Sequence, residues 1–174
     1  MKLSLSHAEI RTYREDDAES LARSVNNDKI SRNTLHIPYP YTLDDAKTRI
    51  AKCLSEPECF HFPIADATGV IGAIGFKRAE PGFQDVQKHV AEIGYWLAEE
   101  YWGRGIITEA VSVFTQWGFE ELGLRRICAA VFATNPASVR VLEKSGYEFE
   151  GRERARYFRG GQLIDGLLYA KVAG

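Results

Sequence analysis

The sequence predicts a mixed α/β fold: one domain over residues 1–174, with a central mixed, mostly antiparallel sheet of about six to seven strands and helices on both faces. The chain has 174 residues, and a second domain would leave each half with little core. Apolar residues alternate in some segments and recur every three or four residues in others. These segments follow one another as strand, two helices, three strands, helix, strand, helix and two strands, which is the order of a mixed α/β domain.

The first part of the chain predicts one strand and two helices. Residues 8–14 alternate as a strand does. Asp16 with Glu19 three residues later has the spacing of a capping box, so we expect a helix that runs to about Asn26. Thr42 is expected to cap a second helix. Its apolar positions keep helical spacing: Leu43, Ala46, Ile50 and Leu54.

The middle of the chain predicts three strands. Residues 60–65 and 70–77 have strand character and are joined by the turn 66–69, so we expect a hairpin. Pro81 and Gly82 then interrupt the chain. Residues 89–97 alternate again and form the third strand.

The last part predicts two helices and three strands. A long amphipathic helix is expected to begin near Gly103, followed by a buried strand over residues 126–132. Asn135 before Pro136 is a typical helix start, and Gly146 a typical helix end. Residues 147–151 and 163–171 are expected to complete the sheet.

The composition argues against several classes of protein. A formal net charge of −2 gives no basic face for nucleic acid. No apolar run is long enough to span a bilayer, and the first residues do not resemble a signal peptide, so we expect a cytoplasmic protein without a membrane partner. The cysteines (Cys53, Cys59, Cys128) are odd in number and widely spaced, which predicts reduced, partly buried thiols. No close histidine pair occurs, and we expect no metal.

Residues 102–108 have the chemistry of an anion site. Gly103 and Gly105 allow backbone N–H groups to turn toward one point, and the first turn of the following helix has unpaired N–H groups and a partial positive charge. A diphosphate fits such a site, with Arg104 adding charge and Thr108 a hydroxyl donor. The same pattern also fits an ordinary helix start. The P-loop pattern is absent, and a dinucleotide fingerprint would need a third glycine at position 108.

These glycines, the helix behind them and Asn-Pro-Ala-Ser at 135–138 resemble the GNAT superfamily of acetyl-CoA-dependent N-acetyltransferases over nearly the whole chain. Residues 91–97, 101–105, 108–110 and 135–147 are most similar to the RimJ/RimL branch, which acetylates the N-termini of ribosomal proteins. The superfamily's loop is usually Gln/Arg-x-x-Gly-x-Gly/Ala. Here Trp102 and Ile107 depart from that pattern, and Gly105 matches it.

The resemblance implies how acetyl-CoA binds. The strand over 89–97 would splay from the strand over 126–132, with the pantetheine arm between them. Backbone groups of Trp96, Leu97 and Ala98 would bind the arm and polarise the thioester carbonyl, and Asn135 would bind the arm from the other side. The diphosphate would lie on the residues of the glycine-containing loop: Trp102, Gly103, Arg104, Gly105, Ile106, Ile107 and Thr108.

The attacking amine must be neutral. An α-amino group has a pKa of about 8 and a lysine one of about 10.4, so at pH 7 lysine requires roughly 3 kcal/mol more to lose its proton. Glu92 is the candidate base, directly or through a water. Ser138 is the candidate acid for the CoA thiolate, because the position of the superfamily's usual tyrosine is Leu142. Glu92 also fits a solvated strand face, and Ser138 a plain first helical turn.

Three functions remain open from the sequence. The first is acetylation of a protein N-terminus, the second acetylation of a polyamine, amino acid or aminoglycoside, and the third noncatalytic binding of acetyl-CoA. The acceptor is expected to meet Tyr39 and Tyr157, and Tyr41, Phe83 and Phe158 are further aromatic candidates. These aromatics also fit plain packing. Relatives occur as monomers and dimers, and either state is expected here.

Overall fold

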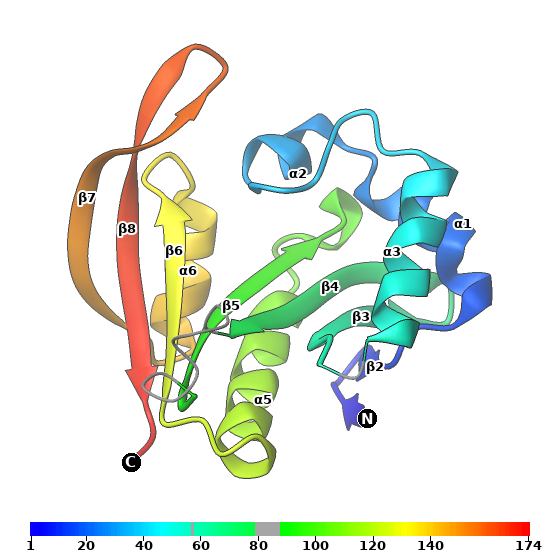
Figure 1. The fold of residues 1–174 in the computed structure, drawn as a ribbon, viewed down its shortest axis with the longest axis horizontal. Helices are drawn as coiled ribbons and strands as arrows, with labels where there is room; N and C mark the ends of the chain where they lie inside the picture. Colours follow the sequence, from blue (N-terminus) through cyan, green and yellow to red (C-terminus); the bar gives the residue numbers. More distant parts are fainter. Residues whose placement is uncertain (57, 79–87) are drawn as a thin grey trace. The chain divides into compact units, whose positions relative to one another are not determined.

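The computed structural model describes residues 1–56, 58–78 and 88–174, and Figure 1 shows the path of the chain. The strands are β1 (Lys2–Ser4), β2 (Glu9–Arg11), β3 (His61–Asp66), β4 (Gly69–Arg78), β5 (Val90–Leu97), β6 (Arg126–Phe132), β7 (Glu148–Arg159) and β8 (Gln162–Val172). The helices are α1 (Ala18–Val25), α2 (Asp28–Arg32), α3 (Leu43–Ser55), α5 (Ile106–Glu121) and α6 (Pro136–Lys144), with short 3-10 turns η1 (Glu15–Asp17) and η2 (Glu99–Tyr101).

The strands hydrogen-bond in the order β1-β2-β3-β4-β5-β6-β8-β7. β5 and β6 run parallel, whereas β1–β2, β2–β3, β3–β4, β6–β8 and β7–β8 run antiparallel. The predicted mixed, mostly antiparallel α/β fold is confirmed. Within the described residues the sheet has eight strands, more than the six to seven expected.

The chain forms two compact units. The first contains Met1–Gly75 and Tyr95–Ala110, and the second contains Phe76–Gly94 and Val111–Gly174. β4, β5 and α5 each contribute residues to both.

In the first unit, apolar faces of the helices share one core. Leu21 and Val25 of α1 and Ala46 and Ile50 of α3 are buried at helical spacing. Tyr41, Cys53 and Trp96 are partly buried and pack against this cluster. Ile30 of α2 belongs to the same cluster, so the core joins the three helices to Trp96 near the end of β5.

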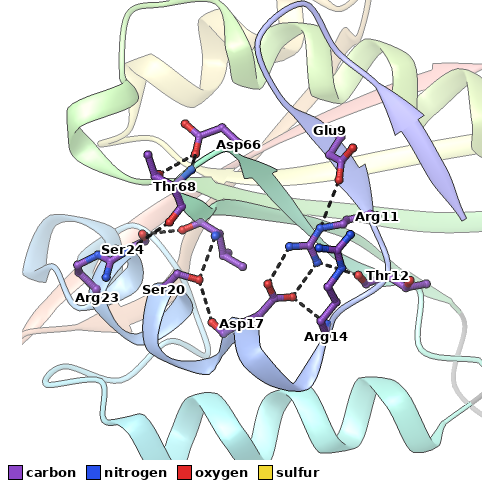
Figure 2. Close-up of polar contacts among 11 residues, drawn as sticks. Glu9, Arg11, Thr12, Arg14, Asp17, Ser20, Arg23, Ser24, Asp66 and Thr68 are labelled. Atoms are coloured by element: carbon purple, nitrogen blue, oxygen red, sulfur yellow. Dashed lines mark hydrogen bonds and ion pairs between the residues drawn. The ribbon is translucent and has the colours of Figure 1, made fainter.

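A polar network, here called the Arg11–Asp17 network, joins β2 to the start of α1 (Figure 2). The buried Arg11 guanidinium donates to both carboxylate oxygens of Asp17, at 2.8 and 2.7 Å. Asp17 also accepts the Arg14 backbone N–H at 2.8 Å. The Ser20 hydroxyl donates to the Asp17 carbonyl and accepts the Val70 N–H, each at 3.0 Å. The buried charges meet partners within the protein, so the network has a structural role.

In the second unit, β7 and β8 form a long hairpin that lies beside β6 (Figure 1). Its turn is Gly160–Gly161, where both residues have positive φ. The Phe76 ring stacks on Phe114 of α5 at 4.4 Å. Leu142 of α6 is fully buried. α5 and α6 thus contribute apolar side chains to this unit's core.

Three local signals in the sequence are confirmed. The Thr42 hydroxyl accepts the Asp45 N–H at 3.1 Å, and the Asp45 carboxylate accepts the Thr42 N–H at 2.8 Å, which caps α3. The Asn135 side chain accepts the Ser138 N–H at 3.1 Å and caps α6 before Pro136. Gly146 follows α6 with φ of 79°.

Several predictions about local structure are wrong. The strand over 8–14 is only the three residues of β2. Asp16 does not cap the first helix: the neighbouring Asp17 accepts the Arg14 N–H, so the chain turns earlier, through η1. The helix predicted from Leu43 to Leu54 is confirmed as α3, but these two residues are 40% and 50% exposed, so its buried face is narrower than the spacing indicates. Pro81 and Gly82 lie outside the described residues.

Other elements were longer than predicted or not predicted. The strand expected over 147–151 continues to Arg159, and the short β1 and α2 had no sequence signal. β1 has three residues and α2 five, which is too short to show a period. β7 is exposed along most of its length, so it lacks the alternation that marks a half-buried strand.

Candidate active site

The segment of residues 102–108, here called the glycine loop, has two glycines in the left-handed region beside the start of a helix. Gly103 and Gly105 have φ of 76° and 81°, a region that favours glycine, and a Cβ at either would meet no atom within 4 Å. α5 begins at Ile106, directly after Gly105, so the last residues of this segment form the start of the helix, and the Glu109 N–H donates to the Gly105 carbonyl at 3.0 Å. The first-turn N–H groups of a helix lie beyond its internal ladder and carry partial positive charge. The open surroundings and these donors fit a diphosphate.

The side chains of the glycine loop differ in how far they are accessible to a ligand. Arg104 is exposed, and its guanidinium lies 5.3 Å from the centre of the Tyr101 ring. The Tyr101 hydroxyl donates to Asp66 at 2.9 Å, which ties the ring to the β3–β4 turn. Ile106 is 5% exposed, so only its backbone can face a ligand. Arg104 therefore rests on an anchored ring beside the loop.

Near the end of β5, the backbone groups of the three candidates Trp96, Leu97 and Ala98 point in different directions. The Ala98 N–H donates to the Ile71 carbonyl of β4 at 2.8 Å. The Trp96 carbonyl also lies toward β4, because a Cβ on Gly72 would come within 2.6 Å of it. Backbone groups alternate in direction along a strand. The Leu97 N–H therefore points to the side away from β4.

Trp102 links the glycine loop to the same strand. Its indole N–H donates to the Leu97 carbonyl at 2.7 Å. This bond agrees with the orientation of Leu97, whose carbonyl and N–H share one side of the strand. Trp102 departs from the superfamily's loop pattern, but its side chain holds the carbonyl of Leu97, one of the three backbone candidates.

Glu92 and Tyr157 both belong to the second unit, and the charge of Glu92 acts on the Tyr157 phenol. Burial raises the pKa of the Tyr157 phenol, and the Glu92 charge raises it further, while Arg156 acts in the opposite direction. Burial and then the Glu92 charge likewise raise the pKa of the Cys128 thiol. The Tyr157 ring also packs against Phe132 at 4.7 Å. The structure thus brings a candidate base and a candidate acceptor residue into one neighbourhood.

The pairing of β5 with β6 ends at Glu92. Their parallel ladder joins Val90 to Arg126, Ala91 to Ile127 and Glu92 to Cys128. β6 continues through Phe132 and stays paired there with β8 on its other side. Glu92, the candidate base, therefore belongs to the last residue pair between β5 and β6.

Asn135 and Ser138 lie together at the start of α6. Asn135 uses its side-chain oxygen as the helix cap, bonded to the Ser138 N–H. The Asn135 amide nitrogen carries two further donors. Both residues are partly exposed. The capping role is therefore compatible with binding a ligand through the amide nitrogen.

A bulge in β7, which the sequence did not predict, lies directly before Tyr157. The register between β7 and β8 shifts between Glu153 and Tyr157, and Ala155 has φ of 53°. The Asp165 carboxylate holds the bulge by accepting the Ala155 N–H and the Arg152 Nε–H, each at 2.7 Å. Asp165 is ten residues from Ala155, so no local pattern could have marked the bulge.

The remaining acceptor candidates are dispersed. Tyr39 belongs to the first unit and is 55% exposed, and Phe158 of the second is 74% exposed. Tyr41 packs in the helical core, where burial raises the pKa of its phenol. Phe83 lies outside the described residues.

Comparison with known proteins identifies the family. The family described as "Acetyltransferase (GNAT) domain" matches residues 7–148, which is most of the chain. The chain belongs to the GNAT acetyltransferase family. This acetyltransferase is therefore an enzyme that takes an acetyl group from acetyl-CoA and transfers it to an amine.

Individual relatives agree with this assignment. The acetyltransferase is 31% identical to "Uncharacterized N-acetyltransferase YoaA" of Bacillus subtilis, over 94% of this chain and 92% of that protein. It is 33% identical to the "Ribosomal-protein-serine acetyltransferase" of Escherichia coli, over 64% of this chain and 59% of that protein. The crystal structure of the ribosomal-protein-S5-alanine acetyltransferase of Vibrio fischeri matches with a TM-score of 0.83 at 25% identity, over 99% of this chain and 96% of that one.

Two further observations concern the described part of the acetyltransferase. No helix there has the length and apolar character that crossing a bilayer requires. Within the same residues, no group of three or more His, Cys, Asp or Glu side chains is placed to hold a metal ion.

Proposed function

We propose that this acetyltransferase modifies the α-amine of a protein N-terminus. The observation that carries the proposal is its similarity to two enzymes named for ribosomal proteins, at 33% and 25% identity. The chemistry supports it, because an α-amine has a pKa of about 8 and loses its proton far more easily than a lysine. We further propose that residues 1–174 act as one domain, since the family match runs through both units.

The glycine loop is proposed to hold the diphosphate of acetyl-CoA. Its ligands are the backbone N–H groups of the loop and of the first turn of α5, from Gly103 to Thr108. Arg104 adds a positive charge from its place over the Tyr101 ring. Ile107 is partly exposed, and its backbone N–H can bind the diphosphate whatever the size of its side chain. Acetyl-CoA supplies a thioester whose carbonyl carbon is open to attack by a neutral amine.

Leu97 is proposed to stabilise the charge that builds on the thioester oxygen. Its N–H points away from β4, whereas the Ala98 N–H is used by Ile71. Trp102 holds the Leu97 carbonyl and so limits movement of the peptide that follows it. A fixed donor aimed at the developing charge lowers the barrier more than it strengthens binding of the ground state. Trp96, Leu97 and Ala98 thus take different roles along one strand.

Glu92 is proposed to accept the proton of the attacking amine, directly or through a water. Tyr157, whose pKa responds to the charge of Glu92, is proposed to contact the acceptor beside it. Asn135 is proposed to bind the pantetheine arm through its amide nitrogen, and Ser138 to return a proton to the departing thiolate. Tyr39 is proposed as a second contact for the acceptor.

An acetylation assay with defined acceptors tests the proposal. Free CoA is measured with peptides that carry a free N-terminal serine, alanine or methionine, and mass spectrometry locates the acetyl group. We expect acetylation of the α-amine of at least one peptide, at a kcat/KM at least tenfold above that for spermidine or free amino acids.

The matched control is the same peptide with a blocked N-terminus and an internal lysine. It should release CoA no faster than buffer does. If a polyamine, amino acid or aminoglycoside turned over faster than every peptide, the proposed acceptor would be wrong, and the acetyltransferase would act on a small molecule.

A further inference from the structure

Cys53 and Cys59 place two thiols in direct contact within the first unit. Their sulfur atoms are 3.0 Å apart, and the Cys59 thiol donates to the Cys53 sulfur. Cys53 lies in the last turns of α3, and Cys59 lies two residues before β3. Both are partly buried and both are free thiols. A disulfide needs the sulfurs at about 2.05 Å, so closure requires a movement of about 1 Å.

The surroundings distinguish the two thiols. Cys53 packs against the apolar core of the helices. Burial raises the pKa of the Cys53 thiol to about 12, although the Arg49 charge acts in the opposite direction. Cys53 is thus held as a neutral thiol, and the thiolate is the species that attacks a disulfide. Cys59 is therefore the better attacking residue.

We propose that Cys53 and Cys59 form a modification site, at which a small-molecule disulfide converts the pair reversibly into an intrachain disulfide. The Cys59 thiolate attacks one sulfur of the small disulfide, forms a mixed disulfide and releases one small thiol. Cys53 then attacks the Cys59 sulfur, loses its proton to solvent and releases the second small thiol. The two protein thiols are oxidised, and one small disulfide is reduced to two thiols.

Closure would join the end of α3 to the residues that enter β3. The bond restrains the unfolded chain over a loop of only a few residues, so we expect a rise of a few degrees in the midpoint of thermal unfolding. Cys128 does not share this arrangement: its thiol donates to the Ala91 carbonyl at 3.4 Å in the second unit. The chain therefore supplies its own control thiol.

The test incubates the whole protein with excess oxidised glutathione, removes the reagent and counts thiols after unfolding. We expect the count to fall from three to one, and dithiothreitol to restore it. Trypsin cleaves after Lys52 and Lys77, so both cysteines lie in one peptide. That peptide should lose the mass of two hydrogens.

Single variants separate an internal disulfide from simple glutathionylation. Cys53→Ser and Cys59→Ser should each keep the remaining thiol or gain one glutathione on it, with no loss of two hydrogens. Cys128→Ser should oxidise as the wild type does. In the wild type, retention of all three thiols after prolonged oxidation overturns the proposal, as does glutathione on Cys59 without the internal bond. The wild-type measurement decides even if a variant fails to fold, and none of these outcomes depends on the acetyl acceptor.

Discussion

The Arg11–Asp17 network and the glycine loop both gather polar groups in the first unit, but the partners of those groups differ. In the network, two buried charges meet each other, and Asp17 also accepts a backbone N–H. In the glycine loop, Gly103 and Gly105 face open space, and the first-turn donors of α5 follow them. A network closed on itself stabilises the fold, whereas donors that project from a helix start suit a ligand.

The largest expected effect on stability lies in the network. Asp17→Asn removes the two-pronged counter-charge of the buried Arg11, which keeps only its longer contact with Glu9 at 3.4 Å, and we expect a loss of about 3 kcal/mol in the free energy of unfolding at pH 7. Denaturant unfolding measures it. Asp16→Asn, on the exposed neighbour, should change stability by less than about 0.5 kcal/mol. Equal effects of the two substitutions would contradict a structural role for the network.

The pH dependence of the stability of Asp17→Asn tests whether the charge of Asp17 is what stabilises the network. Burial favours a raised pKa for the Asp17 carboxyl, but hydrogen bonds from Arg11 and Arg14 and their charges outweigh it and lower the pKa. A lowered pKa contributes stability above the unfolded value of about 3.9, and that stability is lost as the pH falls through the folded value. The difference between wild type and Asp17→Asn should therefore be constant from pH 7 to 5 and shrink below pH 4.

The next effect lies in the glycine loop. Gly105→Asp places a carboxylate beside the proposed diphosphate, and like charges about 4 Å apart repel by about 4 kcal/mol at an effective dielectric of 20. We expect acetyl-CoA to bind about 1,000-fold more weakly, as measured by titration calorimetry, in a protein that still folds. Gly160→Asp also introduces an aspartate at positive φ into open space, and should leave affinity unchanged. Unchanged affinity in Gly105→Asp would falsify the loop assignment.

A third test asks whether Glu92, unlike Asp17, serves chemistry. Glu92→Gln removes the proposed base, and we expect kcat to fall about 100-fold with little change in acetyl-CoA affinity. The fall should be smaller at high pH, where more of the acceptor amine is already neutral. Glu148→Gln, on an exposed carboxylate at the start of β7, serves as the control. A pH-independent loss together with reduced thermal stability would assign Glu92 to the fold instead.

A smaller effect on kcat is expected from the hydrogen bond that links Trp102 of the glycine loop to Leu97 of β5. Trp102→Phe keeps an aromatic ring but removes the indole N–H that holds the Leu97 carbonyl. One neutral hydrogen bond contributes about 1 kcal/mol, so we expect kcat to fall about fivefold. The KM for acetyl-CoA should change less than twofold, because the Leu97 amide acts as charge develops. A rise in KM at constant kcat would show that Trp102 serves binding alone.

The smallest effect is expected at Arg104. Its guanidinium is exposed, so Arg104→Ala should weaken acetyl-CoA binding only about threefold at low salt, and the difference should vanish near 0.5 M salt. Tyr101→Phe keeps the ring under Arg104 and tests whether the bond to Asp66 matters. An effect of Arg104→Ala that is independent of salt would argue against a screened surface charge.

The sequence predicted the features that depend on neighbouring residues. Thr42 and Asp45, Asn135 before Pro136, and Gly146 specify helix ends within a few positions, and the structure has all three. The glycine loop is also a local feature, so its place at the start of α5 could be predicted from the sequence. Short-range chemistry therefore explains where the predictions succeeded.

The features that could not be predicted from the sequence depend on partners far away along the chain. The direction of the Leu97 N–H follows from the bond of Ala98 to Ile71, which is 27 residues away. The β7 bulge depends on Asp165, and the start of the first helix is set by Asp17, which is held by Arg11 on β2. Such pairings leave no period in the sequence.

The central claim is that main-chain amides of the glycine loop bind the diphosphate of acetyl-CoA. Assigned amide spectra of the protein, recorded by NMR during titration with CoA, test it most directly. We predict that the largest shifts occur at the amides of Gly103 and Gly105–Thr108, and that they persist in Arg104→Ala, where only the side chain is lost. Saturating CoA that shifts other amides and leaves these unmoved would contradict the account.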